Sequence, residues 1–99
     1  MIFWVYIVKC ADGSYYTGHT DNLEKRVAEH QVGAIPGCYT HQHRPLTLVF
    51  SQPCITREEA LAAERQIKGW SRAKKEAMIA GNWQEVSRLS KSRERNPGR

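Results

Sequence analysis

The sequence predicts an α+β domain in which helices pack against a small sheet of three strands. Apolar runs rich in β-branched and aromatic residues occur at 3–8, 15–17 and 46–50, as is typical of strands. Four other segments begin with the capping patterns of helices. The resulting order is β-β-α-β-α-α-α, and the first two strands are expected to be antiparallel because a tight turn joins them.

The turn between the first two strands contains Asp12 and Gly13, a strong hairpin signal. We expect Gly18 to end the second strand. Asp21, with an acidic residue three positions later, is expected to cap the first helix, which should run to about Gln31. A loop that contains glycine and proline then leads into the third strand.

Three further helices follow in the predicted order. Each begins at a residue whose side chain can cap the first turn. The polar segment 92–99 has nothing to bury and is expected to be disordered. We therefore expect a domain over residues 1–80, an additional C-terminal helix over 81–91 and a disordered basic tail over 92–99. The expected helices run from Thr56 to about Lys68, from Ser71 to near Gly81, and from Asn82 over a shorter stretch.

Length and charge limit the class of protein. The 99 residues suffice for one domain, and no apolar run is long enough to span a membrane. The N-terminus shows no secretory signal, so we expect a cytoplasmic protein. Residues 1–64 hold five basic and seven acidic side chains, whereas residues 65–99 hold ten basic and three acidic ones. This asymmetry predicts either a polyanionic partner or a solvated helix face with a frayed tail.

Arg26 lies at an unusual place on the first predicted helix. Leu23 and Val27 form its apolar stripe, and Arg26 lies at the border of that stripe. A guanidinium there can reach a cleft while its stem packs against apolar neighbours. The alternative is an ion pair with Glu29 on a solvated face.

Glu64 lies inside an apolar stripe, in line with Ala60 and Ile67 on the second predicted helix. Burial of a carboxylate is strongly unfavourable unless the group is paired. The partner could be a basic neighbour or a backbone N–H, or it could be a divalent metal ion. The residues alone leave both alternatives open.

The hairpin resembles a known family. The tripeptides WVY at 4–6 and YTG at 16–18 resemble the two halves of the GIY-YIG nuclease motif, with Trp4 in place of its first glycine. The pattern continues in order and spacing with Arg26 and Glu64, and the resemblance covers about residues 3–75. It is closest to the short, stand-alone bacterial branch, and it implies a three-stranded antiparallel sheet flanked by helices.

The resemblance implies a metal-dependent endonuclease that hydrolyses phosphodiester bonds in DNA, or alternatively in RNA. Tyr16 would be the general base that activates water, and Tyr6 would line the site or share its hydrogen-bond network. Arg26 would hold the scissile phosphate with its planar guanidinium. Glu64 would bind one Mg²⁺ or Mn²⁺ ion, since such ions prefer oxygen ligands. His19 would move a proton or contact a phosphate; equally, it is only a polar residue at the helix entrance.

The resemblance also implies contacts with nucleic acid outside the reacting groups. The basic C-terminal segment would add attraction to phosphates that does not depend on sequence. The alternative function is a catalytically dormant nucleic-acid-binding module, or a subunit of a larger repair complex that relies on a protein partner for targeting. A third possible function is that of a scaffold that binds protein partners through Trp70 and Trp83. The expected nucleic-acid contacts are Asn22, His30, Tyr39, Thr40, Arg44 and Lys68.

Overall fold

A computed structural model describes residues 2–32 and 44–94 of the chain, with side chains as far as residue 90. The chain divides into two compact units, Met1–Lys68 and Gly69–Arg99. The described part of the first unit contains the sheet and two helices, and that of the second unit contains two more helices.

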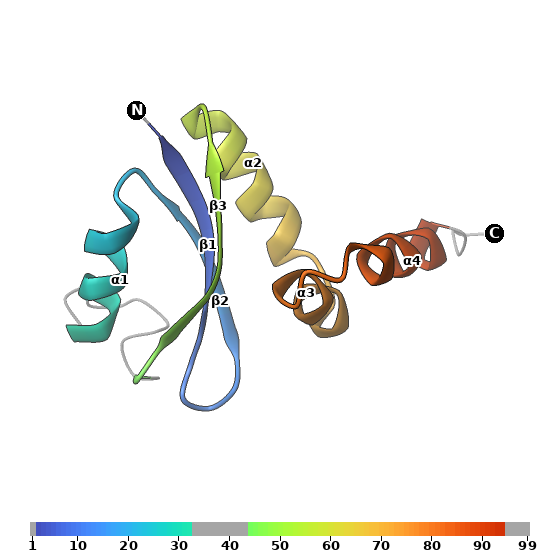
Figure 1. The fold of residues 1–99 in the computed structure, drawn as a ribbon, viewed down its shortest axis with the longest axis horizontal. Helices are drawn as coiled ribbons and strands as arrows, with labels where there is room; N and C mark the ends of the chain where they lie inside the picture. The colour runs from blue at the N-terminus through green and yellow to red at the C-terminus, as the bar shows by residue number, and fades with distance from the viewer. Residues whose placement is uncertain (1, 33–43, 95–99) are drawn as a thin grey trace. The chain divides into compact units, whose positions relative to one another are not determined.

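The first unit is a three-stranded sheet between two helices (Figure 1). β1 (Phe3–Lys9) lies in the middle and pairs antiparallel with β2 (Tyr15–Thr20) and with β3 (Thr47–Cys54). α1 (Leu23–Val32) covers one face of the sheet, and α2 (Arg57–Lys68) covers the other. The α+β class and the antiparallel sheet expected from the sequence are confirmed.

Hydrogen bonds between close neighbours in sequence form the turn between β1 and β2. The N–H of Cys10 donates to the carbonyl of Ser14 at 2.8 Å. Oδ1 of Asp12 accepts from both the N–H and the hydroxyl of Ser14, at 3.0 and 2.6 Å. Gly13 has a φ of 88°, which residues with a side chain rarely adopt. The hairpin therefore lies where its Asp-Gly signal predicted it.

Gly18 lies inside β2 and does not end it, contrary to our expectation. The strand continues to Thr20, and Gly18 lies directly opposite Tyr6 of β1. A Cβ atom at position 18 would lie 2.6 Å from Oη and 2.8 Å from Cζ of Tyr6. The glycine is therefore needed because the phenol ring of the neighbouring strand lies over it.

Capping side chains set the helix starts in the first unit. Oδ1 of Asn22 accepts a hydrogen bond from the N–H of Lys25 at 3.1 Å, so Asn22 caps α1 and the expected cap at Asp21 is wrong by one residue. Both residue types cap helices, and the local sequence does not choose between two in a row. Thr56 caps α2 as expected, because its hydroxyl accepts from the N–H of Glu59 at 3.1 Å.

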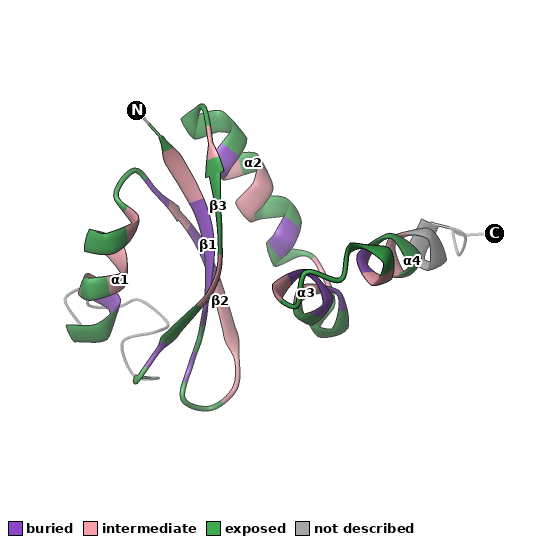
Figure 2. Cartoon of the chain, in the orientation of Figure 1, coloured by how far each residue is buried: buried purple, intermediate pink, exposed green. Residues whose placement is uncertain are grey.

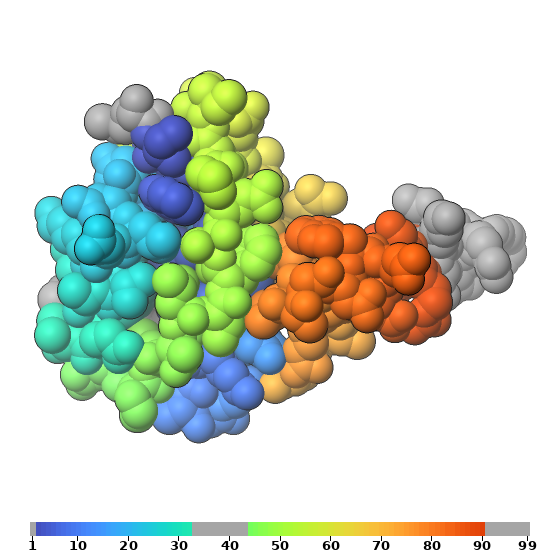
Figure 3. All heavy atoms as spheres, in the orientation of Figure 1, coloured from blue at the N-terminus to red at the C-terminus, as the bar shows by residue number. Residues whose placement is uncertain are grey.

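β3 is longer than the strand expected over residues 46–50, since it ends only at Cys54. Pro53 lies within it, opposite Trp4. A proline lacks the N–H that a central strand requires, but β3 is an edge strand of the sheet, where one row of backbone groups needs no partner strand. Figure 3 shows β3 at the surface of the first unit, between β1 and α2.

Much of β1 is buried (Figure 2), and this strand contributes to the core of the first unit on both of its faces. Successive side chains of a strand point to opposite faces, so Val5 and Ile7, both buried, point to the face that α2 covers. The α1 side holds a buried cluster made by Tyr6, Val8, Cys10 and Leu46, with Tyr16 and Leu23 packed against it. The sheet therefore brings Tyr6 and Tyr16 to the same side, next to α1.

The second unit contains α3 (Arg72–Ile79) and α4 (Trp83–Glu94). Oγ of Ser71 accepts from the N–H of Lys74 at 3.2 Å, so Ser71 caps α3 as expected. Nζ of Lys74 lies 4.2 Å from the ring centroid of Trp70, which explains how this lysine is buried. Gly81 follows α3 with a φ of 73°.

α4 corrects two expectations about the C-terminus. The helix has 12 residues, as many as α2, and continues to residue 94. The expectation of a shorter helix is therefore wrong. The expectation of disorder from residue 92 is wrong for residues 92–94, and residues 95–99 lie outside the described part. Nε of Arg88 donates to Glu85 at 2.9 Å, and such pairs support a helix that buries little apolar surface. None of the described helices is long and apolar enough to cross a membrane.

Candidate active site

His30 connects the two motif tyrosines from the buried side of α1. Its side chain is 2% exposed, and its Nε2 lies 2.9 Å from the phenol oxygen of Tyr6, within hydrogen-bond distance. The ring of Tyr16 meets it edge-on, with the centroids 5.4 Å apart. Burial, together with the positive charge of Arg26, lowers the pKa of His30, and the charge of Glu29 opposes this only in part. A neutral imidazole can accept a hydrogen bond from the Tyr6 hydroxyl, so Tyr6 and His30 form an internal hydrogen-bonded pair, and the ring of Tyr16 packs against it.

Glu64 points from α2 toward β2, where two basic side chains hold its carboxylate. Nζ of Lys68 donates to Oε2 at 2.7 Å, and Nδ1 of His19 donates to Oε1. The Glu64 side chain is 12% exposed. Burial on its own raises the pKa of Glu64, but the hydrogen bonds and charges of Lys68 and His19 outweigh it and hold the pKa below its usual value. The group is therefore a carboxylate at neutral pH.

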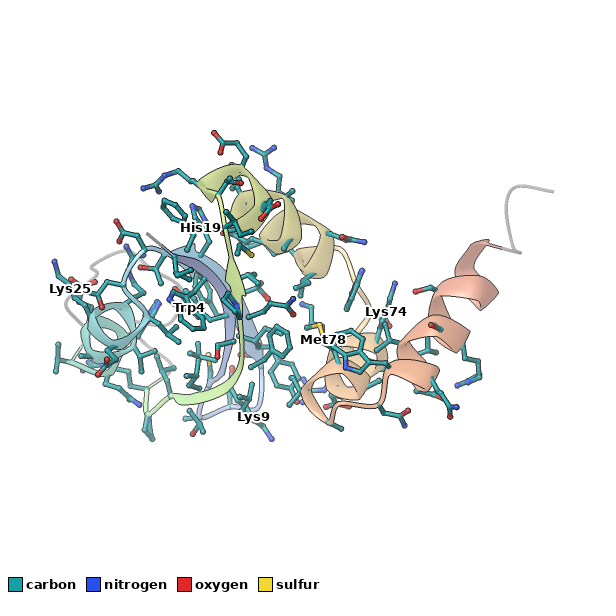
Figure 4. The ribbon with its side chains drawn as sticks, turned by 45° about the horizontal axis from the view of Figure 1, so that its top comes forward. Trp4, Lys9, His19, Lys25, Lys74 and Met78 are labelled. Carbon is teal, nitrogen blue, oxygen red and sulfur yellow. The ribbon has the colours of Figure 1, made fainter. Side chains whose placement is uncertain are left out.

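Lys68 links this ion pair to the tyrosines. Its Nζ lies 5.9 Å from the ring centroid of Tyr16 as well as 2.7 Å from Glu64. Figure 4 shows His19 on the side of the sheet that faces α2, and Trp4 on the side that faces α1. The chain of contacts runs along β2 in the order Tyr6, His30, Tyr16, Lys68, Glu64 and His19.

Arg26 forms an ion pair with a residue of its own helix, α1. Its Nε lies 3.3 Å from Oε1 of Glu29, one turn along α1, so the pair that the sequence left as an alternative is present. The side chain is 39% exposed, and a pair of this kind contributes little to stability. A small pocket of about 90 Å³ beside it is lined by Thr20, Asp21, Asn22, Lys25, Arg26 and Glu29.

The residues expected to contact nucleic acid lie in different environments. Asn22 is exposed but uses its side-chain oxygen to cap α1. His30 is buried, so we correct its expected role from a nucleic-acid contact to an internal one. Arg44 and Lys68 are exposed on the first unit. The remaining two, Tyr39 and Thr40, lie outside the described residues.

Sequence reasoning identified Glu64 as anomalous but did not identify its partners. The signal for Lys68 was present, because a glutamate four residues before a lysine is a common helical ion pair. No local signal connects His19 to Glu64, which lies 45 residues later. Only the fold brings these two together.

The donor set around Glu64 fits a site with one protein ligand. Oxygen is the ligand that Mg²⁺ prefers, and such an ion keeps several waters, so a single carboxylate suffices. The described residues contain no group of three or more histidine, cysteine or acidic side chains that could enclose a metal ion. Lys68 shares the carboxylate, but its side chain is 50% exposed and can move away on its flexible stem.

Residues 2–77 match the family model described as the GIY-YIG catalytic domain. The chain belongs to the GIY-YIG family. This GIY-YIG chain is 43% identical over 75 residues to a "UPF0213 protein" of Halobacterium salinarum, a match that covers 76% of this chain and 96% of the relative. A "UPF0213 protein" of Staphylococcus saprophyticus is 44% identical over 77 residues, which cover 78% of this chain and 93% of the relative.

The likeness of this GIY-YIG chain extends to solved structures. The solution NMR structure of the UPF0213 protein from Bacillus halodurans matches with a TM-score of 0.53 and 35% identity, over 91% of this chain and 98% of that one. A protein of E. faecalis, also solved by solution NMR, matches with a TM-score of 0.56 and 31% identity, over 82% and 85%. The chain is thus a member of the short, stand-alone part of a nuclease family.

Proposed function

We propose that this GIY-YIG protein is an endonuclease that hydrolyses phosphodiester bonds in DNA, with one Mg²⁺ or Mn²⁺ ion as cofactor. The observation that carries the proposal is the chain of contacts along β2, in which Lys68 joins the Glu64 carboxylate to the ring of Tyr16. It places an acidic group, a cation and a phenol next to one another at one edge of the sheet. Such a group can bind a phosphodiester and move a proton.

Tyr16 has the role of general base: its phenol first gives up its own proton to solvent, which the positive charge of Lys68 near the ring favours, and the phenolate oxygen then takes a proton from the attacking water. Its ring lies between His30 on one side and the Lys68 ammonium on the other. His30 and Tyr6 hold the ring in place from the buried side and do not meet the substrate themselves. His19 is next to the acid, where it can donate a proton or a hydrogen bond to a phosphate oxygen.

Arg26 has the role of phosphate clamp. Its present partner Glu29 lies on the same helix, and both side chains are partly exposed, so a phosphate can replace this weak pair. A guanidinium then donates two parallel hydrogen bonds to the phosphate and stabilises the charge that develops on it.

Glu64 would hold the divalent ion. When bound, the ion polarises the phosphate and makes a water more acidic. The basic residues at 65–99 attract the phosphate backbone without reading its sequence, so we expect recognition of the backbone or of DNA structure.

A second function is favoured by one observation. Both Glu64 oxygens accept hydrogen bonds from basic side chains, and a protein fixed in that state would bind nucleic acid without cutting it. Such a protein would be a dormant binding module, or a subunit that a protein partner targets to repair sites. The cleavage experiment below separates the two functions.

The experiment measures cleavage of supercoiled plasmid, branched DNA and RNA with Mg²⁺ or Mn²⁺. We expect the wild type to cut DNA, and we expect Tyr16→Phe to lower kcat about 10²–10⁴-fold, the usual contribution of a general base. Arg26→Ala and Glu64→Ala should also lose cleavage. Tyr15→Phe is the matched control, since alternation points Tyr15 to the other face of the sheet.

One result would reject the nuclease, and another would reject the role of Tyr16 in it. The first is wild-type protein that binds DNA in a salt-sensitive manner without cutting it, together with Glu64→Ala that binds equally well; this result identifies the dormant module. The second is equal activity of the Tyr15→Phe and Tyr16→Phe variants, which would remove Tyr16 from the reaction.

A further inference from the structure

We propose that Lys68 is a positioning residue that couples the binding of nucleic acid to the binding of the metal ion at Glu64. Its ammonium is bound to the Glu64 carboxylate until it binds a phosphate of the nucleic acid instead. The carboxylate is then free for the metal ion, so the substrate completes the metal site. The inference rests on the proposed function, because it assumes that Glu64 is the metal ligand.

The two ends of the ion pair differ in their freedom to move. The Glu64 side chain is 12% exposed, and His19 fixes its second oxygen. The Lys68 side chain is 50% exposed, and its Nζ lies 2.7 Å from Oε2, the carboxylate oxygen that His19 does not contact. In a partly buried carboxylate paired with an exposed ammonium, the cation can be exchanged while the acid stays in place.

A divalent ion and the Lys68 ammonium compete for the same place. Both are positive and both bind the same carboxylate oxygen, so they repel one another at contact distance. A hard cation needs that oxygen free, since the described residues offer no group of three or more acidic, histidine or cysteine side chains that could hold the ion instead. Bound metal therefore releases Lys68, and released Lys68 favours bound metal.

A phosphodiester supplies the alternative partner for Lys68. The lysine ammonium also lies 5.9 Å from the Tyr16 ring centroid, so it is already next to the residue proposed to activate the attacking water. If the Lys68 ammonium moves from Glu64 to a phosphate oxygen, the lysine stays in the site and the Glu64 carboxylate becomes free. By thermodynamic linkage, nucleic acid and metal then raise one another's affinity by the same factor.

The first test measures Mn²⁺ binding to the protein without DNA, from the loss of the electron paramagnetic resonance signal of free Mn²⁺. Lys68→Met should bind Mn²⁺ about tenfold more tightly than wild type, as removal of one charged hydrogen bond to the carboxylate predicts. The matched control is Arg65→Met, which removes the same charge from the same helix on a side chain adjacent in sequence to Glu64. It should change the affinity less than about twofold, because neighbouring residues of a helix do not face each other.

The second test measures the coupling itself, in a Tyr16→Phe background that prevents cleavage. The affinity for a labelled DNA duplex is compared in EDTA and in saturating Mn²⁺. We expect Mn²⁺ to raise the DNA affinity of the protein that keeps Lys68. In the protein with Lys68→Met, the increase in DNA affinity should be severalfold smaller.

Equal Mn²⁺ affinities of wild type and Lys68→Met, or equal effects of Lys68→Met and Arg65→Met, would overturn the inference. The variant Glu64→Gln separates this outcome from failure of the proposed function. If Glu64→Gln binds Mn²⁺ as well as wild type, the ion does not bind at Glu64, and both proposals fall. If Glu64→Gln loses Mn²⁺ and Lys68→Met leaves it unchanged, only the coupling falls.

Discussion

Replacement of Gly18 by alanine tests how β2 is packed against the phenol of Tyr6. The new Cβ atom would lie 2.6 Å from Oη, 2.8 Å from Cζ and 3.2 Å from Cε2 of Tyr6. Real Cβ atoms essentially never come within 3.0 Å of a heavy atom that belongs neither to their own residue nor to its chain neighbours. The ring cannot swing into solvent to relieve the contact, since Tyr6 is 0% exposed and lies between β2 and α1.

Two opposing effects set the magnitude. Overpacking of a buried site typically destabilises by about 1–3 kcal/mol. Alanine also restricts the unfolded chain more than glycine does, which stabilises by about 0.4–1 kcal/mol. We therefore expect Gly18→Ala to lower the free energy of unfolding by about 1–2 kcal/mol, and the melting temperature by about 4–16 °C for a domain of this size.

The assay is urea unfolding followed by circular dichroism, carried out as a double-mutant cycle. In a Tyr6→Leu background the atoms that would clash are absent, so Gly18→Ala should cost little or should stabilise. We expect a coupling energy of at least about 1 kcal/mol between the two positions. A Gly18→Ala variant as stable as wild type, or an effect of equal size in both backgrounds, would show that the ring of Tyr6 does not require a glycine at position 18.

Two further predictions concern stability. The lowered pKa of His30 means that the folded protein keeps this ring neutral while the unfolded chain protonates it below its usual value of 6.5, so stability is full above pH 6.5 and falls as the pH drops below it. Urea titrations from pH 7.5 to 5 should show this loss in wild type and a smaller loss in His30→Gln, whereas parallel curves would contradict it. The hydroxyl of Thr17 is buried with no hydrogen-bond partner among the described residues, so Thr17→Val should leave the unfolding free energy unchanged or raise it by up to about 1 kcal/mol. A loss of more than about 1 kcal/mol in the same assay would show that the hydroxyl is bonded.

Local signals predicted most of the fold because they act over a few residues. The Asp12-Gly13 turn and the caps at Thr56 and Ser71 depend on side chains within three positions, and the structure has all of them. The failures have a different origin. Gly18 looked like the end of a strand because its actual reason, the ring of Tyr6, lies on the neighbouring strand.

The candidate site could be predicted from the sequence only in part, for the same reason. Helical periodicity identified Glu64 as a carboxylate in an apolar stripe, and a lysine four residues later was a visible partner. The contact with His19 requires the sheet and α2 to be in place. For Arg26 the sequence offered a cleft or a pair with Glu29, and the described side chains form that pair.

The location of the metal ion decides whether Glu64 is its ligand. Crystals of the Tyr16→Phe protein with Mn²⁺ and a DNA duplex can be measured at a wavelength where manganese scatters anomalously. We predict one strong peak at the Glu64 carboxylate, next to a phosphate, with the Lys68 ammonium on that phosphate. Manganese bound elsewhere, with Lys68 still on Glu64 in the presence of DNA, would contradict the account.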